Sequence, residues 1–190
     1  MAKRAPVRVV EALNHIVETN ERLRSFWASS HGWAPRTAAD MLAKSRLDRH
    51  VALSLTLKLW VRFDTGPDEE GRLILAWTNL GALLEGSFKT LLAVYLEDYR
   101  RSARPIRRHG KVIDPDEATL DGLLTFLRAE VWSPTSAANW GPWAQRVQQR
   151  RNAVHAFRER DLGTFAEFYG DVVTYDEFLQ NMELGLPYPS

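Results

Sequence analysis

Residues 72–99, RLILAWTNLGALLEGSFKTLLAVYLEDY, form the longest apolar segment of the chain. Wound as a helix, this segment is hydrophobic on nearly every side, which is typical of a central buried helix rather than of a surface helix. Glu85 interrupts it near the middle, and Gly81, one turn earlier, leaves room for another segment to approach. Glu85 therefore lies either at the exposed edge of the helix or in the interior, where an arginine must neutralise it.

The segments around this helix also favour an all-α fold. Residues 6–29 show helical spacing, and residues 37–63 offer apolar positions four apart as well as a strand-like alternation. We predict a helix for residues 37–63, because an isolated strand would need partners and no other segment alternates convincingly. Further helices are expected over residues 115–132, through the stretch before Arg160, and over residues 164–184. The sequence thus predicts a single domain, residues 1–190, built as an up-and-down bundle of about six helices.

Several polar residues predict where these helices begin. Thr37 with Asp40, and Thr164 with Glu167, have the spacing of capping pairs. Asp114 precedes a proline at the first position of the helix expected over residues 115–132. Residues 100–113 show no periodicity and are expected to be a loop. Residues 132–143, WSPTSAANWGPW, are expected to be a loop that leads into the next helix.

Composition narrows the class of protein. The chain has 190 residues, of which 45% are hydrophobic and 26% charged, as in an ordinary globular domain. The absence of cysteine excludes disulfides and thiolate metal sites. The five histidines have no metal-ligand spacing, and neither a glycine-rich phosphate loop nor a nucleophile elbow is present, so no cofactor is expected. No signal peptide or membrane-spanning run is recognisable, which predicts a cytoplasmic protein without membrane association.

Charge is unevenly distributed although the net charge is only +1. The loop 100–113 contains basic residues and no acidic ones, whereas residues 161–190 contain only acidic ones among their charged residues. A local basic patch on a nearly neutral protein suits a polyanion bound at one place. The candidate RNA-binding residues in this loop are Arg104, Arg107, Arg108 and Lys111.

The most concentrated group of chemically active side chains is residues 148–157, QQRRNAVHAF. On a helix, Arg150 falls inside an apolar stripe formed by Trp140, Trp143, Val147, Val154 and Phe157. A buried guanidinium needs an acidic partner, and Glu85 is the expected one. Arg151 and His155 are four residues apart, at the edge of the stripe. A cation beside a group that titrates near neutrality is what phosphodiester chemistry requires.

This stretch resembles the motif of the HEPN superfamily, all-helical proteins that include many bacterial toxin and defence ribonucleases. The motif is an arginine, usually followed by a polar residue such as asparagine, with a histidine after four to six intervening residues. Arg150 has the right spacing to His155, whereas Arg151-Asn152 matches the Arg-polar pair but leaves only three residues before His155. Either arginine can therefore hold the motif position. The longer run QRRNAVHAF, continuing to RDLGTF and ending in LPYPS, resembles bacterial HEPN-like proteins over much of the chain.

The resemblance implies a metal-independent endoribonuclease, a toxin or defence effector, that cleaves RNA by attack of the 2′-hydroxyl at a composite site in a homodimer. His155 would act as acid or base, Arg150 or Arg151 would hold the phosphate, and Asn152 would orient phosphate or ribose. An antitoxin or a nucleotidyltransferase is the partner expected beside RNA. The alternative is a non-catalytic HEPN-like protein that uses the same arginines to bind RNA, a nucleotide or another protein.

Overall fold

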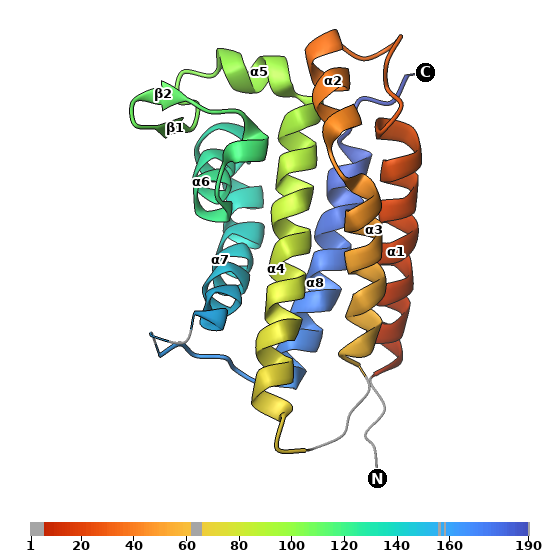
Figure 1. Ribbon diagram of the computed structural model, residues 1–190, viewed down its shortest axis with the longest axis vertical. Coiled ribbons are helices and arrows are strands. Elements are labelled where there is room, and N and C mark those ends of the chain that lie inside the picture. Colours follow the sequence, from red (N-terminus) through yellow and green to blue (C-terminus); the bar gives the residue numbers. More distant parts are fainter. Residues whose placement is uncertain (1–5, 62–65, 156, 158, 190) are drawn as a thin grey trace.

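The computed structural model describes residues 6–61, 66–155, 157 and 159–189, and these residues are mostly helical (Figure 1). The predicted all-α class is confirmed, although the described residues form eight α-helices instead of six. The helices are α1 (Val7–Trp27), α2 (Arg36–Lys44), α3 (Leu47–Thr56), α4 (Glu69–Val94), α5 (Leu96–Arg101), α6 (Leu120–Phe126), α7 (Pro134–Arg151) and α8 (Phe165–Leu184).

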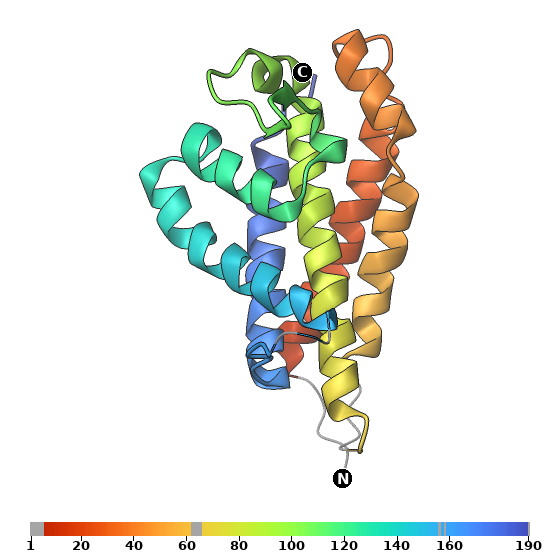
Figure 2. The same cartoon turned by 60° about the vertical axis from the view of Figure 1, so that its left-hand side comes forward.

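Helix α4 occupies the centre of the molecule, as its apolar sequence predicts. It packs against α2 and α3 on one side, against α6 and α7 on another, and against α8. Figures 1 and 2 show α1, α3, α4 and α8 lying side by side along the long axis, with α7 crossing α4 more obliquely. These neighbours cover most of the apolar side chains of α4, although Leu75 is 52% exposed.

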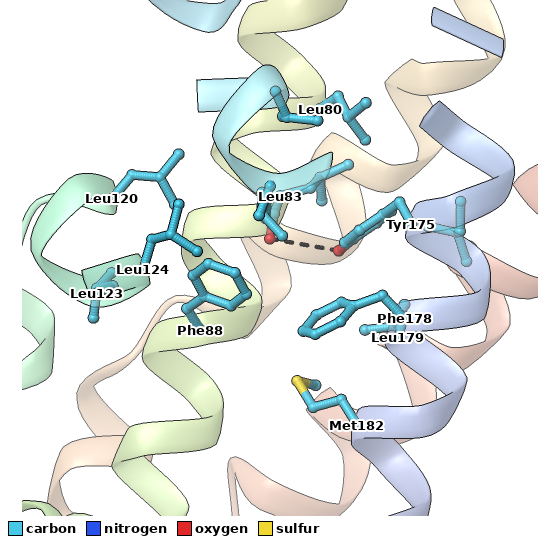
Figure 3. Packing of buried hydrophobic residues seen from close by; sticks show 14 of the residues in the cluster. Leu80, Leu83, Phe88, Leu120, Leu123, Leu124, Tyr175, Phe178, Leu179 and Met182 are labelled. Carbon is cyan, nitrogen blue, oxygen red and sulfur yellow. Dashed lines mark hydrogen bonds between the residues drawn. The ribbon is translucent and has the colours of Figure 1, made fainter. Parts of the chain in front are cut away.

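The core is continuous from α6 through α4 to α8 (Figure 3). Leu83 and Phe88 of α4 are fully buried. The ring of Tyr175 of α8 is buried in the same core, and its hydroxyl points toward Leu83. The Tyr175 hydroxyl hydrogen-bonds Ser87 at 2.9 Å and donates to the Leu83 carbonyl at 3.4 Å. A polar group buried this deeply requires such partners, and these bonds fix α8 against the middle of α4.

The helix predicted over residues 37–63 is two helices. The chain turns at Ser45, whose backbone is extended (ψ 143°) and whose hydroxyl donates to the Leu42 carbonyl. The preference for helix over strand is confirmed for the described part, and the predicted end at Phe63 lies outside the described residues. The capping pair predicted here is wrong: α2 begins at Arg36 without a side-chain cap, and Asp40 binds His31 instead, at 2.9 Å.

The two predicted loops also contain regular structure. Residues 134–143 form the first half of α7, because Ser133 caps the helix and Pro134 occupies its first position, where a missing N–H costs nothing. The basic segment contains a short antiparallel hairpin of β1 (Arg107–Arg108) and β2 (Lys111–Val112).

The helix predicted over residues 115–132 starts later than expected. Pro115–Glu117 is a single 3₁₀ turn, and α6 follows it with Thr119 as its N-cap. A π-helical turn, Leu127–Val131, continues α6. The capping pair at the start of α8 is confirmed as a complete capping box of Thr164 and Glu167.

Among the described helices, none combines the length and the apolar character that crossing a bilayer would need.

Candidate functional site at the end of helix α7

Arg150 points into the core, as the helical spacing predicts, but its partner is not Glu85. Its side chain is only 4% exposed, and Nη2 donates to Glu167 at 2.8 Å and to Asp161 at 3.3 Å. The guanidinium carbon lies 4.9 Å from the centre of the Trp77 ring. The prediction of an Arg150–Glu85 pair is therefore wrong, because α7 turns Arg150 towards α8 and the loop before it.

The loop between α7 and α8 closes around this guanidinium. Gly163 has a positive φ of 61°, and a Cβ there would lie 2.4 Å from Nη2 of Arg150, so only glycine fits. The pKa of Asp161 is lowered by the Gly163 backbone N–H and then by Arg150. The pKa of Glu167 is lowered mainly by its hydrogen bond with Arg150, and next by the Thr164 backbone N–H. Arg150 thus holds the loop against α8 and is not available to a ligand.

Arg151 is the arginine that meets Glu85. Its Nη1 donates to Oε2 of Glu85 at 2.5 Å, while Lys89 binds Oε1 of the same carboxylate at 2.8 Å. The Arg151 side chain is 30% exposed and that of Glu85 19%, so the cluster lies at the surface boundary. Gly81 provides the space predicted from the sequence, since a Cβ there would lie 2.6–2.8 Å from the Arg151 side chain. The cluster of two cations and one carboxylate keeps a net positive charge.

His155 lies just beyond the helix. The predicted continuation of the motif helix to about residue 160 is wrong, because α7 ends at Arg151 and a 3₁₀ turn, Asn152–Val154, follows it. Asn152 begins this turn, and His155 follows it as the C-cap residue with an extended backbone (φ −86°, ψ 93°). The His155 backbone N–H bonds the Asn152 carbonyl at 3.2 Å. The His155 side chain is exposed, and its ring has no hydrogen bond within the described residues.

The predicted apolar stripe is buried only in its first part. Trp143 and Val147 are in the core, but Val154 is 47% exposed and Phe157 is 102% exposed. The stripe fails where the helix ends, because residues beyond Arg151 no longer follow the helical period. Two exposed apolar side chains consequently lie close in sequence to His155.

The candidate RNA-binding residues of the basic segment lie elsewhere. His109 (φ 51°) and Gly110 (φ 80°) form the turn between β1 and β2, and the hairpin lies near α5, at the end of the molecule that holds the C-terminus. Helix α7 ends in the other half (Figures 1 and 2). The structure does not bring the hairpin to His155, so the two predicted groups are separate surfaces.

Some of these basic side chains also form hydrogen bonds or ion pairs with other residues of the chain. Arg107 donates to the Gly110 carbonyl at 3.0 Å, and Arg108 donates to the Glu117 carbonyl at 2.6 Å. Arg104 lies 3.8 Å from Glu130, and Lys111 is exposed. Backbone carbonyl partners leave the charge of Arg107 and Arg108 unneutralised, so the hairpin remains a basic surface.

A groove next to the Arg151 cluster was not foreseen from the sequence. Arg151, Glu85 and Lys89 line a cavity of about 660 Å³ between α2, α3 and α4. His50 of α3 also lines it, although its spacing from other residues gave no signal. The pairing of Lys89 with Glu85 could have been predicted from the sequence, because Lys89 stands four residues after Glu85 on one helix.

Comparison of the chain with protein-family models, curated proteins and solved structures finds no match. No group of three or more histidine, aspartate or glutamate side chains is arranged to hold a metal ion in the described part of the chain. The side chains of the site are therefore the basis on which function can be inferred.

Proposed function

We propose that the protein is a metal-independent endoribonuclease of the HEPN type, with an HEPN-like helical bundle, acting in the cytoplasm as a toxin or defence effector. The observation that carries the proposal is the end of α7, where Arg151, Asn152 and His155 follow one another over little more than one turn. Arg151-Asn152 matches the Arg-polar pair of the family in a partly exposed position, with three residues before His155 instead of four to six.

Arg151 is the motif arginine in this proposal. Arg150, which has the family spacing, is enclosed by Glu167, Asp161 and Trp77 and is 4% exposed. Arg151 is 30% exposed and shares Glu85 with Lys89, so part of its positive charge remains for a phosphate. The spacing from Arg151 to His155 is one residue shorter than the family minimum, and the 3₁₀ turn Asn152–Val154 lies between the two residues.

The reaction would be an internal transesterification. The ribose 2′-oxygen forms a bond to the adjacent phosphorus, the bond from phosphorus to the 5′-oxygen breaks, and a 2′,3′-cyclic phosphate and a 5′-hydroxyl result. One base takes the 2′-hydroxyl proton and one acid supplies a proton to the leaving 5′-oxygen. An imidazole side chain can serve as either the base or the acid. Arg151 would stabilise the charge that develops on the phosphate, and Asn152 would orient the phosphate or the ribose.

The two proton transfers support a homodimer. The motif occurs once in the sequence, so a site that uses one histidine as base and another as acid needs two chains related by two-fold symmetry. Val154 and Phe157, exposed on either side of His155, supply apolar surface that association would bury. The expected regulator is an antitoxin or a nucleotidyltransferase that covers or modifies this end of α7.

One observation favours a second candidate, a non-catalytic protein that binds RNA or a nucleotide. The His155 ring has no orienting hydrogen bond within the described residues, whereas a catalytic histidine is usually held by a third group. The second candidate keeps Arg151 as a phosphate ligand but assigns no proton transfer to His155.

The test is incubation of the purified protein with labelled RNA in the presence of EDTA, followed by analysis of the product ends. The proposed enzyme gives 2′,3′-cyclic phosphate and 5′-hydroxyl ends, and His155→Ala loses this activity while its circular dichroism and melting temperature stay unchanged. His31→Ala is the matched control, because His31 is exposed in the loop between α1 and α2. Equal cleavage by His155→Ala, prepared from a strain without contaminating nucleases, would overturn the enzymatic proposal, and RNA binding without cleavage would support the second candidate.

A further inference from the structure

The groove between α2, α3 and α4 has the dimensions of a ligand site. Its volume of about 660 Å³ falls in the range that small-molecule pockets usually occupy. Along α4 its lining extends from Ala82 to Ala93, about 16 Å at the helical rise per residue. Arg151 and Lys89 face it from α7 and α4, and Arg49 faces it from α3.

His50 gives this groove an unused acceptor. The residue is only 9% exposed, and its Nε2 donates to the Leu83 carbonyl at 2.9 Å. Because a carbonyl can only accept, this bond places the ring hydrogen on Nε2 and leaves Nδ1 as an acceptor in the neutral ring. Nε2 and Cδ2 are the ring atoms nearest to the position of a Cβ on Gly86, so Nδ1 is farther from that part of α4 than they are. Nδ1 has no hydrogen-bond partner in the described part of the chain.

The charges around the groove favour an anion. Arg46 pairs with Asp48 at 2.6 Å, Arg100 pairs with Asp114 at 2.6 Å, and Lys89 shares Glu85 with Arg151. Two further lining cations, Lys44 and Arg49, have no ion-pair partner among the described residues. The lining as a whole contains six lysines and arginines against four aspartates and glutamates, so an anionic ligand gains from binding there.

A ligand that satisfies both features must carry a phosphate and a hydroxyl. We propose that the groove binds a ribonucleotide unit, with its phosphate at Arg151, Lys89 and Arg49 and its 2′-hydroxyl donating to Nδ1 of His50. The unit is either a free nucleotide or one residue of an RNA strand. His155 does not line the groove, so in a strand the bound unit is a neighbour of the one that is cut. This inference rests on the proposed action on RNA and adds a positioning residue to it.

The experiment uses the full chain carrying His155→Ala, so that RNA is not cleaved while binding is measured. The probes are a fluorescent ten-nucleotide RNA, its DNA counterpart, and the competitors AMP, 2′-deoxy-AMP and inorganic phosphate. We expect RNA to bind about tenfold more tightly than DNA, the factor that one hydrogen bond of about 1.4 kcal/mol supplies. Competition by AMP in preference to 2′-deoxy-AMP indicates a free nucleotide as the ligand, whereas no competition by AMP indicates an RNA strand.

The matched variants separate a ligand role from a structural one. In His50→Gln the amide nitrogen can keep the bond to the Leu83 carbonyl, but the amide oxygen is bonded to Cδ and not to Cγ, so no acceptor remains at the position of Nδ1. The preference for ribose should therefore fall to about one while DNA affinity stays unchanged. Arg49→Ala should weaken RNA and DNA equally, and Arg24→Ala, on the exposed face of α1, should weaken neither. A purely structural role of His50 predicts an unchanged ribose preference in His50→Gln.

The outcomes distinguish this inference from the proposed enzyme. Loss of ribose preference in His50→Gln supports the groove site, whether or not the wild-type protein cleaves RNA in the separate end-group assay. Cleavage by the wild type together with an unchanged preference in His50→Gln overturns the groove site alone. Should His50→Gln fail to fold, Arg49→Ala decides the matter, because affinity equal to that of Arg24→Ala overturns the phosphate contacts.

Discussion

Arg150 and Arg151 are consecutive in the sequence and lie in opposite environments. Arg150 is enclosed on the α8 side of α7, against Trp77, Glu167 and Asp161. Arg151 lies on the α4 side, over Gly81, where it shares Glu85 with a lysine at the rim of a groove. One residue step turns a helix by about 100°, which is enough to move a guanidinium from the core to the surface boundary. A motif of residue types therefore says little about roles until each side chain is assigned to a face.

The difference also separates two uses of a positive charge. A guanidinium that is 4% exposed and bound to two carboxylates stabilises the connection between helices. A guanidinium that is 30% exposed and shares its carboxylate with a second cation can exchange that partner for a phosphate. The predictions below test whether stability and function divide between the two arginines in this way.

The largest effect expected is the loss of stability on replacing Arg150, the arginine that points into the core. Arg150→Ala removes two charge-assisted hydrogen bonds and the side chain packed over Trp77, so we expect the free energy of unfolding to fall by about 3 kcal/mol. The melting temperature should decrease by about 6–12 °C for a chain of this size. Thermal and urea unfolding followed by circular dichroism measure both quantities. Arg150→Met, which keeps the stem without the charge, shows how much of the loss is packing. A stable but inactive Arg150→Ala would instead make Arg150 the motif arginine.

The next largest effect is expected for a substitution at Gly81, where α7 approaches α4 closely. Gly81→Ala adds a Cβ that would lie 2.6–2.8 Å from three carbon atoms of Arg151, one of which is the Arg151 Cβ. Because these distances are too short, either α7 or the Arg151 side chain must shift. The overpacking should outweigh the gain of about 1 kcal/mol in helix propensity and destabilise the protein by about 1–2 kcal/mol. RNA binding should weaken as well, because Arg151 is displaced.

The control for this change lies in α8. Gly170→Ala adds a Cβ with no atom within 4 Å, so it should stabilise the protein by about 0.5–1 kcal/mol. Urea denaturation of both variants measures the comparison. Equal stabilisation by the two substitutions would show that α7 does not hold Arg151 against Gly81.

Replacing Arg151, which lies at the rim of the groove, should affect function more than stability. Arg151→Ala leaves Glu85 paired with Lys89 at 2.8 Å, so no carboxylate is stranded, and we expect a loss of about 1 kcal/mol or less. RNA affinity and cleavage should fall strongly. The magnitude of the slope of the logarithm of the binding constant against the logarithm of the salt concentration should fall by about one, which corresponds to one lost phosphate contact. Fluorescence anisotropy at several salt concentrations tests this expectation. A loss of stability as large as that of Arg150→Ala would remove the distinction between the two faces.

The sequence predicted the parts of the fold that depend on local pattern. The central helix follows from the apolar run of residues 72–99, and the capping box of Thr164 and Glu167 follows from their spacing. The break at Ser45 and the end of α7 at Arg151 could not be predicted, because no glycine or proline marks either place. Likewise, the burial of Arg150 followed from the helical period, but the choice between Glu85 and Glu167 as its partner depends on how α7 packs between α4 and α8.

Sequence information was weakest for the groove. His50, Lys89 and Arg151 come from three helices that are far apart in the sequence, and no spacing connects them. Lys89 has a local signal in its position one turn after Glu85, but His50 has none. Its significance depends on the Leu83 carbonyl, a backbone group whose availability only the packed structure shows.

The smallest effect expected concerns the pH dependence that His50 contributes. Burial lowers the pKa of His50 in the folded protein, although its bond to the Leu83 carbonyl acts in the opposite direction. The unfolded chain has a histidine pKa of about 6.5, so as the pH falls below this value the unfolded state takes up a proton that the folded state does not. Stability linked to His50 is therefore present above about pH 6.5 and is lost as the pH falls towards the folded pKa.

His50→Gln should remove this part of the pH dependence. Between pH 7 and pH 6 the wild type should lose more stability than the variant, by less than about 1 kcal/mol, in urea unfolding curves measured at both pH values. The other four histidines are common to both proteins, so their contributions cancel in the difference. Parallel curves for the two proteins would mean that folded His50 protonates as readily as the unfolded chain. A ring protonated at both nitrogens could not accept a hydroxyl hydrogen bond, so that outcome would also count against the site proposed in the groove.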